Sequence, residues 1–224
     1  KRSLKELKIN FIVNSDVLQI KTNEIIEKNF INEGLIYIHI SRGKGLRSHN
    51  WNSNITPSLV ISGLHKDINL NQKPINLISS PDIRWKRCDI KSVSLLPNVM
   101  LKQKALERGA FECVMTDNKG FVTEATTSNL WIVKNNTLIT RPISNEILSG
   151  VTRNNILEVA KLLKIKIKLK KFYEKDIYNC EGVFISNSTS LIIEAKKLNK
   201  KNLNYGKSKI INNIKLGLFK TLNN

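Results

Sequence analysis

Lys91 is the central candidate in a stretch whose residue types could do covalent chemistry. It lies in PDIRWKRCDIKSVSLLPNV, residues 81–99, and the apolar residues that follow it are expected to enter a core: Val93, Leu95, Leu96 and Val99. A buried ammonium costs desolvation energy unless it is paired or its pKa is lowered. A lysine with a lowered pKa is the type that forms Schiff bases with carbonyl compounds. The stretch therefore indicates an imine-forming lysine, with a solvated surface lysine as the simpler alternative.

A second candidate site lies at the start of the helix expected over residues 150–163. The run Ser149-Gly150-Val151-Thr152 places backbone N–H groups and a hydroxyl at the positive end of the helix dipole. Gly150 lets the backbone approach a ligand closely. The run suits an anion such as a phosphate, and a plain helix cap provided by Thr152 is the alternative.

Two further polar features have apolar neighbours. Ser186-Asn187-Ser188-Thr189-Ser190 ends the buried strand expected over residues 182–188, and such strand ends commonly line ligand sites. An ordinary polar turn is the alternative. Glu124 lies between apolar residues and requires a cationic or N–H partner, for which a salt bridge with a lysine is the simpler explanation. Together these features suit one ligand that carries a phosphate and a ring nitrogen.

The elements that must position these residues begin with an α+β piece, a small N-terminal domain of residues 1–66. We expect Asp16 to cap the second of its helices. The pattern predicts helices at 2–8 and 16–32 and strands at 34–43 and 58–64. Residues 67–80 are polar, contain Pro74 and carry few core signals, so they are the predicted interdomain linker.

The larger part, residues 81–224, is predicted to hold most of the strands. Gly109 is expected to end a helix, and the Asn135-Asn136 pair indicates a hairpin turn. We expect strands at 83–90, 111–116, 120–125, 129–133, 137–141, 165–172 and 182–188, and helices at 95–108, 150–163 and 206–221. The fold class is therefore α+β, with two domains.

Composition narrows the class of protein. With 224 residues, 41% hydrophobic and 25% charged, the chain has the profile of a soluble globular protein. Cys88, Cys113 and Cys180 show no metal-ligand spacing and suggest a reducing cytoplasm, and we expect no metal site. The net charge of +19 comes from lysines spread along the whole chain, so we expect no specific nucleic-acid partner and no membrane association.

Several ordered motifs resemble those of one enzyme family. Residues 124–130, EATTSNL, then 138–140, LIT, then 148–153, LSGVTR, closely resemble the signature of the class IV aminotransferases, the fold-type-IV pyridoxal-phosphate enzymes. DIRWKRCDIKSVSLLPNVMLKQKA is similar to their Schiff-base lysine segment, above all in D-amino-acid transaminases. SRGKGLRSHNW resembles the carboxylate-binding loop of that subgroup. The resemblance covers essentially the whole chain and implies an incomplete small α/β domain followed by a larger, barrel-like pyridoxal-phosphate-binding domain over residues 81–224.

The resemblance implies a role for each candidate residue. Lys91 would form the aldimine with pyridoxal 5'-phosphate, Glu124 would hold the protonated pyridine nitrogen, and Leu148 would pack against the ring. Arg47 and His49 would reach in from the partner subunit to hold the substrate carboxylate, which implies a homodimer. The implied phosphate-binding residues are Gly150, Val151, Thr152, Asn187 and Ser188.

The implied reaction is transamination between an amino acid and a 2-oxo acid, such as D-alanine and 2-oxoglutarate. It would follow a ping-pong course in which the freed Lys91 amine moves the α-proton. A branched-chain aminotransferase or an aminodeoxychorismate lyase of the same family is the alternative. Outside enzymes, the alternatives are a basic nucleic-acid-binding protein and an inactive scaffold protein.

The sequence departs from the family's pattern at a few positions. Trp131 replaces a phenylalanine or tyrosine, Asn187 replaces a serine of the similar relatives, and Leu191 replaces a glutamate. The family's small domain normally begins before Lys1. The resemblance therefore implies that a phosphate-binding arginine and a tyrosine of the carboxylate site belong to a preceding segment.

Overall fold

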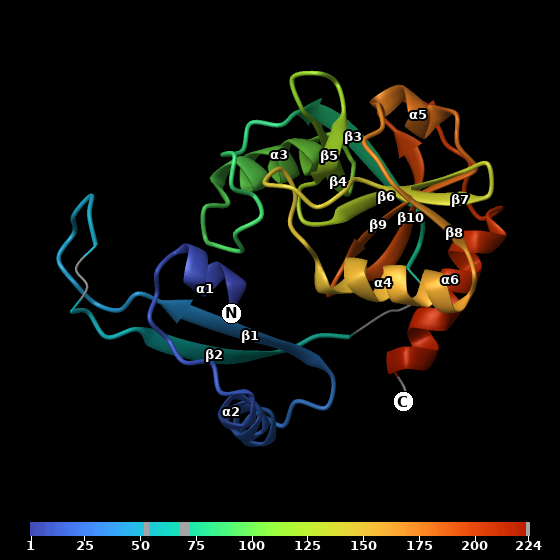
Figure 1. Cartoon of the computed structure of the whole chain (residues 1–224). Helices are drawn as coiled ribbons and strands as arrows, with labels where there is room; N and C mark the ends of the chain where they lie inside the picture. Colours follow the sequence, from blue (N-terminus) through green and yellow to red (C-terminus); the bar gives the residue numbers. More distant parts are fainter. Residues whose placement is uncertain (52–53, 68–71, 223–224) are drawn as a thin grey trace. The chain divides into compact units, whose positions relative to one another are not determined.

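The computed structural model describes residues 1–51, 54–67 and 72–222. The chain divides into two compact units, Lys1–Asn69 and Leu70–Asn224, whose elements are labelled in Figure 1. The first unit contains, in chain order, α1 (Arg2–Glu6), α2 (Ser15–Lys28), β1 (Gly34–Ser41) and β2 (Ser58–His65). All four elements lie where the sequence predicts them.

The first unit pairs a two-stranded antiparallel sheet with a helix. β1 and β2 are hydrogen-bonded over their whole length, from Gly34 opposite His65 to Ser41 opposite Ser58. The side chain of Ile31, just after α2, packs onto β2 at Gly63, where an added Cβ would lie 2.4 Å from Ile31 Cδ1. A glycine at this position therefore lets the connection between helix and sheet approach the strand closely.

The start of α2 differs from the prediction by two residues. Asn14, not Asp16, is the capping residue, because its side-chain oxygen accepts the backbone N–H groups of Asp16 at 2.9 Å and Val17 at 3.1 Å. Asp16 lies within the first turn instead, where its negative charge still complements the helix dipole.

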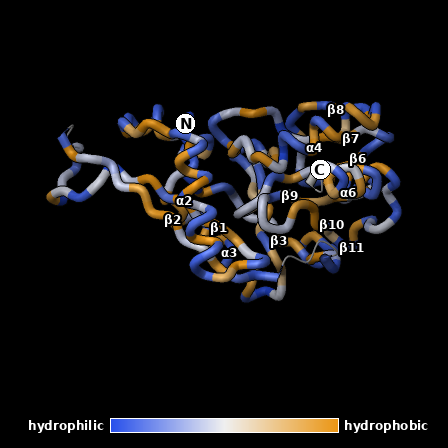
Figure 2. The backbone as a smooth tube through the Cα atoms, turned by 90° about the horizontal axis from the view of Figure 1, so that it is seen from below, coloured by the Kyte–Doolittle hydropathy of each residue, from blue (hydrophilic) through white to orange (hydrophobic). Residues whose placement is uncertain are grey.

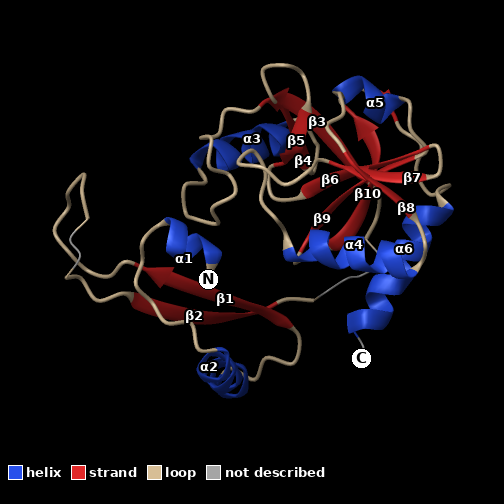
Figure 3. Ribbon diagram, viewed as in Figure 1, coloured by secondary structure: helices blue, strands red, loops and turns tan. Residues whose placement is uncertain are grey.

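The second unit is built on one mixed sheet, in which the described residues form nine strands (Figure 3). Its order is β5-β4-β3-β10-β9-β6-β7-β8, with β11 paired to β10. The bounds are β3 (Ile75–Pro81), β4 (Glu112–Thr116), β5 (Val122–Ala125), β6 (Asn129–Lys134), β7 (Thr137–Thr140), β8 (Lys166–Leu169), β9 (Gly182–Asn187), β10 (Leu191–Leu198) and β11 (Lys201–Asn202). β3 is parallel to both of its neighbours and β8 is parallel to β7, while the other pairs are antiparallel.

Apolar side chains from the two faces of this sheet form separate clusters. Along β6, Trp131 and Val133 join one cluster while Leu130 and Ile132 join the other, as the alternation of a strand requires. Helices α4 (Val151–Leu162) and α6 (Lys209–Leu222) contribute to the first cluster, and α5 (Glu174–Tyr178) contributes to the second. Figure 2 shows hydrophobic residues along strands such as β3 and β10. A third, smaller cluster joins α3 (Leu96–Glu107) to β3 and β4.

Two predictions about this unit are wrong. Residues 83–90 form no strand, and β3 lies instead within the predicted linker of residues 67–80. β3 is buried on both faces between two parallel neighbours, so its sequence INLISSP lacks the alternation that marks a half-exposed strand. Sequence reasoning also missed α5, β10 and β11. The division of the chain into a small domain and a cofactor-binding domain at residues 66 and 81 stays a prediction.

Two turn predictions are confirmed by backbone angles. Gly109 follows the end of α3 with φ +66°, the left-handed conformation that glycine adopts without a steric penalty. Asn135 and Asn136 have φ values of +51° and +53° between β6 and β7, as a two-residue hairpin turn requires.

Candidate active site

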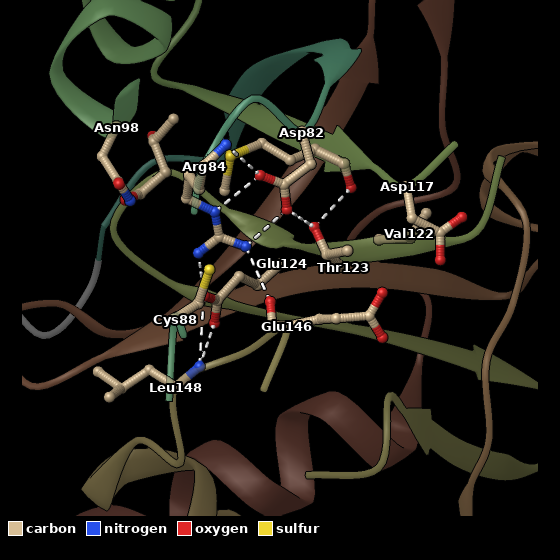
Figure 4. A network of polar contacts seen from close by, with 12 residues as sticks. Asp82, Arg84, Cys88, Asn98, Asp117, Val122, Thr123, Glu124, Glu146 and Leu148 are labelled. Carbon is tan, nitrogen blue, oxygen red and sulfur yellow. Dashed lines mark hydrogen bonds and ion pairs between the residues drawn. The ribbon is translucent and has the colours of Figure 1, made fainter. Parts of the chain in front are cut away.

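Glu124 is the buried carboxylate at the centre of the candidate site. It belongs to β5, is only 5% exposed, and forms an ion pair with Arg84, whose Nη1 lies 2.5 Å from Oε1 (Figure 4). Asn129 Nδ2 donates to Oε2 at 2.9 Å, and the backbone N–H of Leu148 lies 3.2 Å and 3.3 Å from the two oxygens. The cationic partner of Glu124 is therefore an arginine and not one of the many lysines.

Arg84 connects this carboxylate to a second one. Its guanidinium forms a fork with Asp82, Nε to Oδ1 at 2.9 Å and Nη2 to Oδ2 at 2.7 Å, and also donates to the carbonyl of Glu146 at 2.9 Å (Figure 4). Burial lowers the pKa of Arg84, but Asp82 and Glu124 outweigh it and hold that pKa above its ordinary value. Burial raises the pKa of Asp82, and Arg84 and Thr123 outweigh that effect, so its pKa is lowered. Arg84 and Asp82 are therefore both ionised at neutral pH.

Burial raises the pKa of Glu124 to about 7, although Arg84 and the N–H of Leu148 act to lower it. A glutamate in the unfolded chain has its ordinary pKa of 4.5. Because the folded pKa is the higher one, the stability that this group contributes is fully present below about pH 4.5 and is lost as the pH rises through about 7.

Glu124→Gln tests this pH dependence. We expect the free energy of unfolding of the wild-type chain, relative to that of the variant, to fall by about 3 kcal/mol between about pH 4.5 and pH 7.5. Urea unfolding at a series of pH values measures the difference, and the variant cancels the titration of all other groups. A difference that stays constant or increases with pH would contradict the raised pKa.

The start of α4 leaves its first N–H groups without a side-chain cap. Its N-cap is Gly150, in an extended conformation with φ −66° and ψ 142°, and no side chain there accepts a capping hydrogen bond. Thr152 is therefore not the cap predicted from the sequence, but a buried residue of the first turn, 5% exposed. Uncapped N–H groups at the positive end of a helix are available to an anion.

Asn129 connects the carboxylate to this helix start. Its Nδ2 donates to Leu148 O at 2.9 Å as well as to Glu124, and a Cβ added to Gly150 would lie 2.5 Å from Asn129 Oδ1. Any residue other than glycine at position 150 would therefore collide with the side chain that links Glu124 to α4.

The Asn187–Ser188 turn lies beside the same region, because β9 pairs with β6 and places Ser186 opposite Asn129. The side-chain oxygen of Asn187 accepts the N–H groups of Thr189 at 3.0 Å and Ser190 at 2.8 Å, while its Nδ2 donates to Ser128 Oγ at 2.9 Å. The side-chain oxygen of Asn187 thus stabilises the polar turn, and its side-chain nitrogen binds Ser128, the residue just before β6. Ser188 is exposed.

A family model for amino-transferases of class IV matches residues 1–198. The chain belongs to the class IV aminotransferase family. It is 31% identical over 207 residues to D-alanine aminotransferase from Bacillus licheniformis, a match covering 92% of this chain and 73% of that one. It is 30% identical over 209 residues to D-alanine aminotransferase from Staphylococcus aureus strain MSSA476, covering 92% and 74%.

Solved structures show the same fold. A Legionella pneumophila protein assigned as a 4-amino-4-deoxychorismate lyase superimposes with a TM-score of 0.90 at 24% identity, covering 98% of this chain and 81% of that one. The branched-chain amino acid aminotransferase of Escherichia coli gives 0.88 at 20% identity, covering 98% and 75%. The predicted α+β, fold-type-IV architecture is confirmed.

Class IV aminotransferases depend on pyridoxal 5'-phosphate, the cofactor that the sequence predicts. The described residues fit it, because Glu124 offers a buried carboxyl group of the kind that binds a ring nitrogen, and the uncapped helix start at Gly150 is of the kind that receives a phosphate. Among the described residues, no helix is long and apolar enough to cross a membrane. The cytoplasmic location stays a prediction.

The surroundings of Lys91 differ from the expectation. Lys91 is exposed and follows the buried Ile90, and the apolar run after it does not enter a core. The exposed fractions are 81% for Val93, 47% for Leu95, 70% for Leu96 and 59% for Val99. α3 directs Leu101 and Ala105 inward instead, which leaves the residues of its first turn outside. The role of Lys91 stays a prediction.

Arg47 and His49 lie in the first unit, in the described part of the segment between β1 and β2, and both are exposed. Their predicted contact with the substrate carboxylate stays a prediction. Sequence reasoning missed Arg84 and Asp82 altogether, although both lie in the DIRW segment quoted for the resemblance. The feature that could have indicated them is the spacing of two residues between Asp82 and Arg84, which allows the guanidinium to donate two hydrogen bonds to the carboxylate.

Proposed function

We propose that this chain is a pyridoxal-phosphate-dependent aminotransferase that transfers the amino group of a D-amino acid, such as D-alanine, to a 2-oxo acid, such as 2-oxoglutarate. The observation that carries the proposal is Glu124, buried and held by Arg84, Asn129 and the Leu148 N–H beside an uncapped helix start. Relatives at 30–31% identity named D-alanine aminotransferase support the choice of substrate.

Glu124 would hold the proton of the cofactor's pyridine nitrogen. Its pKa of about 7 means that the carboxyl group can share a proton with a ring nitrogen at neutral pH. The cofactor, when bound with a protonated ring, acts as the electron sink for the α-carbon of the substrate. Arg84 compensates the negative charge of Glu124 through its ion pair with Oε1, and this contact fixes the orientation of the carboxylate.

The phosphate would be held by the first turn of α4 and by the neighbouring turn. Val151 and Thr152 contribute N–H groups at the positive end of the helix, and Thr152 also contributes its hydroxyl. Asn187, the last residue of β9, and Ser188, which follows it, would contribute further polar groups. Leu148, which is partly buried and donates its backbone N–H to Glu124, would contact the ring.

Lys91 would hold the cofactor covalently through Nζ, with loss of water from the carbonyl group. The amino group of the incoming amino acid would displace Nζ, and the freed amine would then move the α-proton as the general base. We also propose a homodimer, in which the partner subunit's Arg47 and the partner's His49 hold the substrate carboxylate through charge-assisted hydrogen bonds. The resemblance of the SRGKGLRSHNW loop to that of the D-amino-acid transaminases supports this pair of roles.

One experiment tests the proposed function. The purified chain, mixed with pyridoxal phosphate, is expected to gain a visible absorbance that borohydride removes while fixing the cofactor covalently to Lys91. D-alanine with 2-oxoglutarate is then expected to yield pyruvate, and L-alanine is not. Turnover of L-isoleucine alone would favour a branched-chain aminotransferase, and release of pyruvate from aminodeoxychorismate would favour the lyase. A chain that takes up no cofactor and binds nucleic acid in a salt-sensitive way would overturn the proposal.

A further inference from the structure

Glu112 is a second buried carboxylate, and the proposed function does not use it. It lies at the start of β4 with an exposed fraction of 0%. Its oxygens accept from three consecutive residues: Thr126 Oγ1 at 3.3 Å, Thr127 N at 3.0 Å, Thr127 Oγ1 at 2.5 Å and Ser128 Oγ at 2.9 Å. The carboxylate therefore holds the whole segment 126–128.

This carboxylate is satisfied by hydrogen bonds and not by an ion pair among the described residues. Lys102 is near enough for the charge of Glu112 to raise its pKa, against a larger lowering by burial, but its Nζ donates to the carbonyl of Phe111. Four donors directed at one buried carboxylate compensate its desolvation and fix the positions of the groups that donate. Segment 126–128 is thus bound tightly to β4.

Segment 126–128 joins the parts of the candidate active site. It follows directly on Glu124 and Ala125 of β5 and leads into Asn129 of β6, the residue that donates to Glu124. Ser128 also accepts from Asn187 Nδ2 at 2.9 Å while it donates to Glu112 at 2.9 Å. A chain of hydrogen bonds therefore runs from Asn187 through Ser128 to Glu112.

Glu112 determines which group donates and which accepts at each step of this series of hydrogen bonds. A carboxylate only accepts, so the Ser128 hydroxyl must give its proton to Glu112 and is left to accept from the Asn187 amide. Asn187 in turn has its oxygen committed to the N–H groups of Thr189 and Ser190, which fixes the amide orientation.

We propose that Glu112 is a positioning residue for the cofactor site. It fixes segment 126–128 and, through Ser128, the Asn187–Ser188 turn, so that the ring-nitrogen carboxylate and the phosphate-binding turn keep their separation. This inference rests on the proposed function, since the cofactor is what would need that separation. The ordering of the Asn187 amide by Glu112 is a property of the protein without cofactor, so it can be tested separately.

Glu112→Gln changes the polarity of the site with little change in shape. The Thr127 N–H is a fixed donor, so the amide oxygen of the new side chain must face it, and the amide nitrogen must face the hydroxyls of Thr127 and Ser128. Both hydroxyls then lose their acceptor. Ser128 no longer has a carboxylate to direct its proton, and its bond to Asn187 weakens.

Glu194→Gln is the matched control. Glu194 is also a buried carboxylate of the sheet, 7% exposed on β10, but it accepts from Gly206 N at 2.8 Å and Lys215 Nζ at 2.8 Å. It therefore holds the C-terminal segment and α6. Loss of its charge should lower stability without touching the cofactor-binding segments.

The test compares the two variants with the wild-type chain of residues 1–224. We expect Glu112→Gln to raise the Kd for pyridoxal phosphate by about tenfold, and Glu194→Gln to leave it within about twofold, although both lower the Tm. In the chain without cofactor, the side-chain amide protons of Asn187 are expected to exchange with solvent faster in Glu112→Gln and at the wild-type rate in Glu194→Gln. Ser128→Ala, which removes only the middle of the hydrogen-bond chain, should reproduce both effects if Glu112→Gln folds poorly.

Two results would overturn the inference while leaving the proposed function intact: a wild-type Kd in both Glu112→Gln and Ser128→Ala, or an equal increase in Glu194→Gln. Failure of the wild-type chain to bind pyridoxal phosphate would overturn the proposed function and, with it, the cofactor role of Glu112. The exchange rate of the Asn187 amide in that case still decides whether Glu112 orders the turn.

Discussion

Lys91→Ala is expected to abolish transamination, lowering kcat for D-alanine and 2-oxoglutarate by about 10,000-fold or more. The proposed role gives this one amine two tasks, covalent attachment of the cofactor and transfer of the α-proton. General acid–base catalysis alone contributes about 100-fold to 10,000-fold. The measurement is the rate of pyruvate formation, together with the mass of the borohydride-treated protein, which should carry no cofactor at this position.

Lys86→Ala is the control for this variant, because Lys86 is an exposed lysine of the same segment, before Cys88. We expect it to keep the wild-type rate and the borohydride label. Added methylamine, which can replace a missing lysine amine in proton transfer, should restore part of the activity of Lys91→Ala. Retention of activity by Lys91→Ala within about tenfold of wild type would refute the assignment of the catalytic amine.

The candidate residues were found from the sequence where the signal was local. Gly150 opens a clearly amphipathic helix, and Glu124 is an acidic residue inside an apolar strand, so both are recognisable by type and neighbours. The pairing of Arg84 with Glu124 is not recognisable, because the two residues lie 40 positions apart and the sequence does not indicate which of many cations a buried carboxylate will meet. Long-range pairing of charges is a property of the folded sheet.

The errors in the fold have a similar cause. Periodicity shows that a segment has an apolar side, but it does not show what covers that side. The run from Val93 to Val99 reads as core-bound and is exposed, whereas β3 reads as a linker and lies in the middle of the sheet. Strands with marked boundaries, such as β6 and β7 around the Asn135-Asn136 turn, were predicted to within a residue.

Arg84→Met is expected to lower the free energy of unfolding by about 3–5 kcal/mol. The side chain of Arg84 is 5% exposed and those of Asp82 and Glu124 are 11% and 7% exposed, so loss of the cation leaves two carboxylates in a region with little water. Chemical unfolding measures the loss. Lys134→Met is the control, because Lys134 and its partner Asp176 are 32% and 27% exposed, and a solvated pair contributes at most about 1 kcal/mol.

The double variant Arg84→Met/Glu124→Gln separates lost packing from stranded charge. The test is made well above pH 7, where Glu124 of the wild-type chain is ionised. If the cost of Arg84→Met there comes from leaving the Glu124 carboxyl group without its cation, then making position 124 neutral should recover about 1–2 kcal/mol of the loss. If the cost comes from the methylenes and hydrogen bonds of Arg84 itself, the two substitutions will add. Recovery would identify Arg84 as the group that allows the carboxyl group of Glu124 to be kept buried, and additive costs would assign the effect of Arg84 to its own packing and hydrogen bonds.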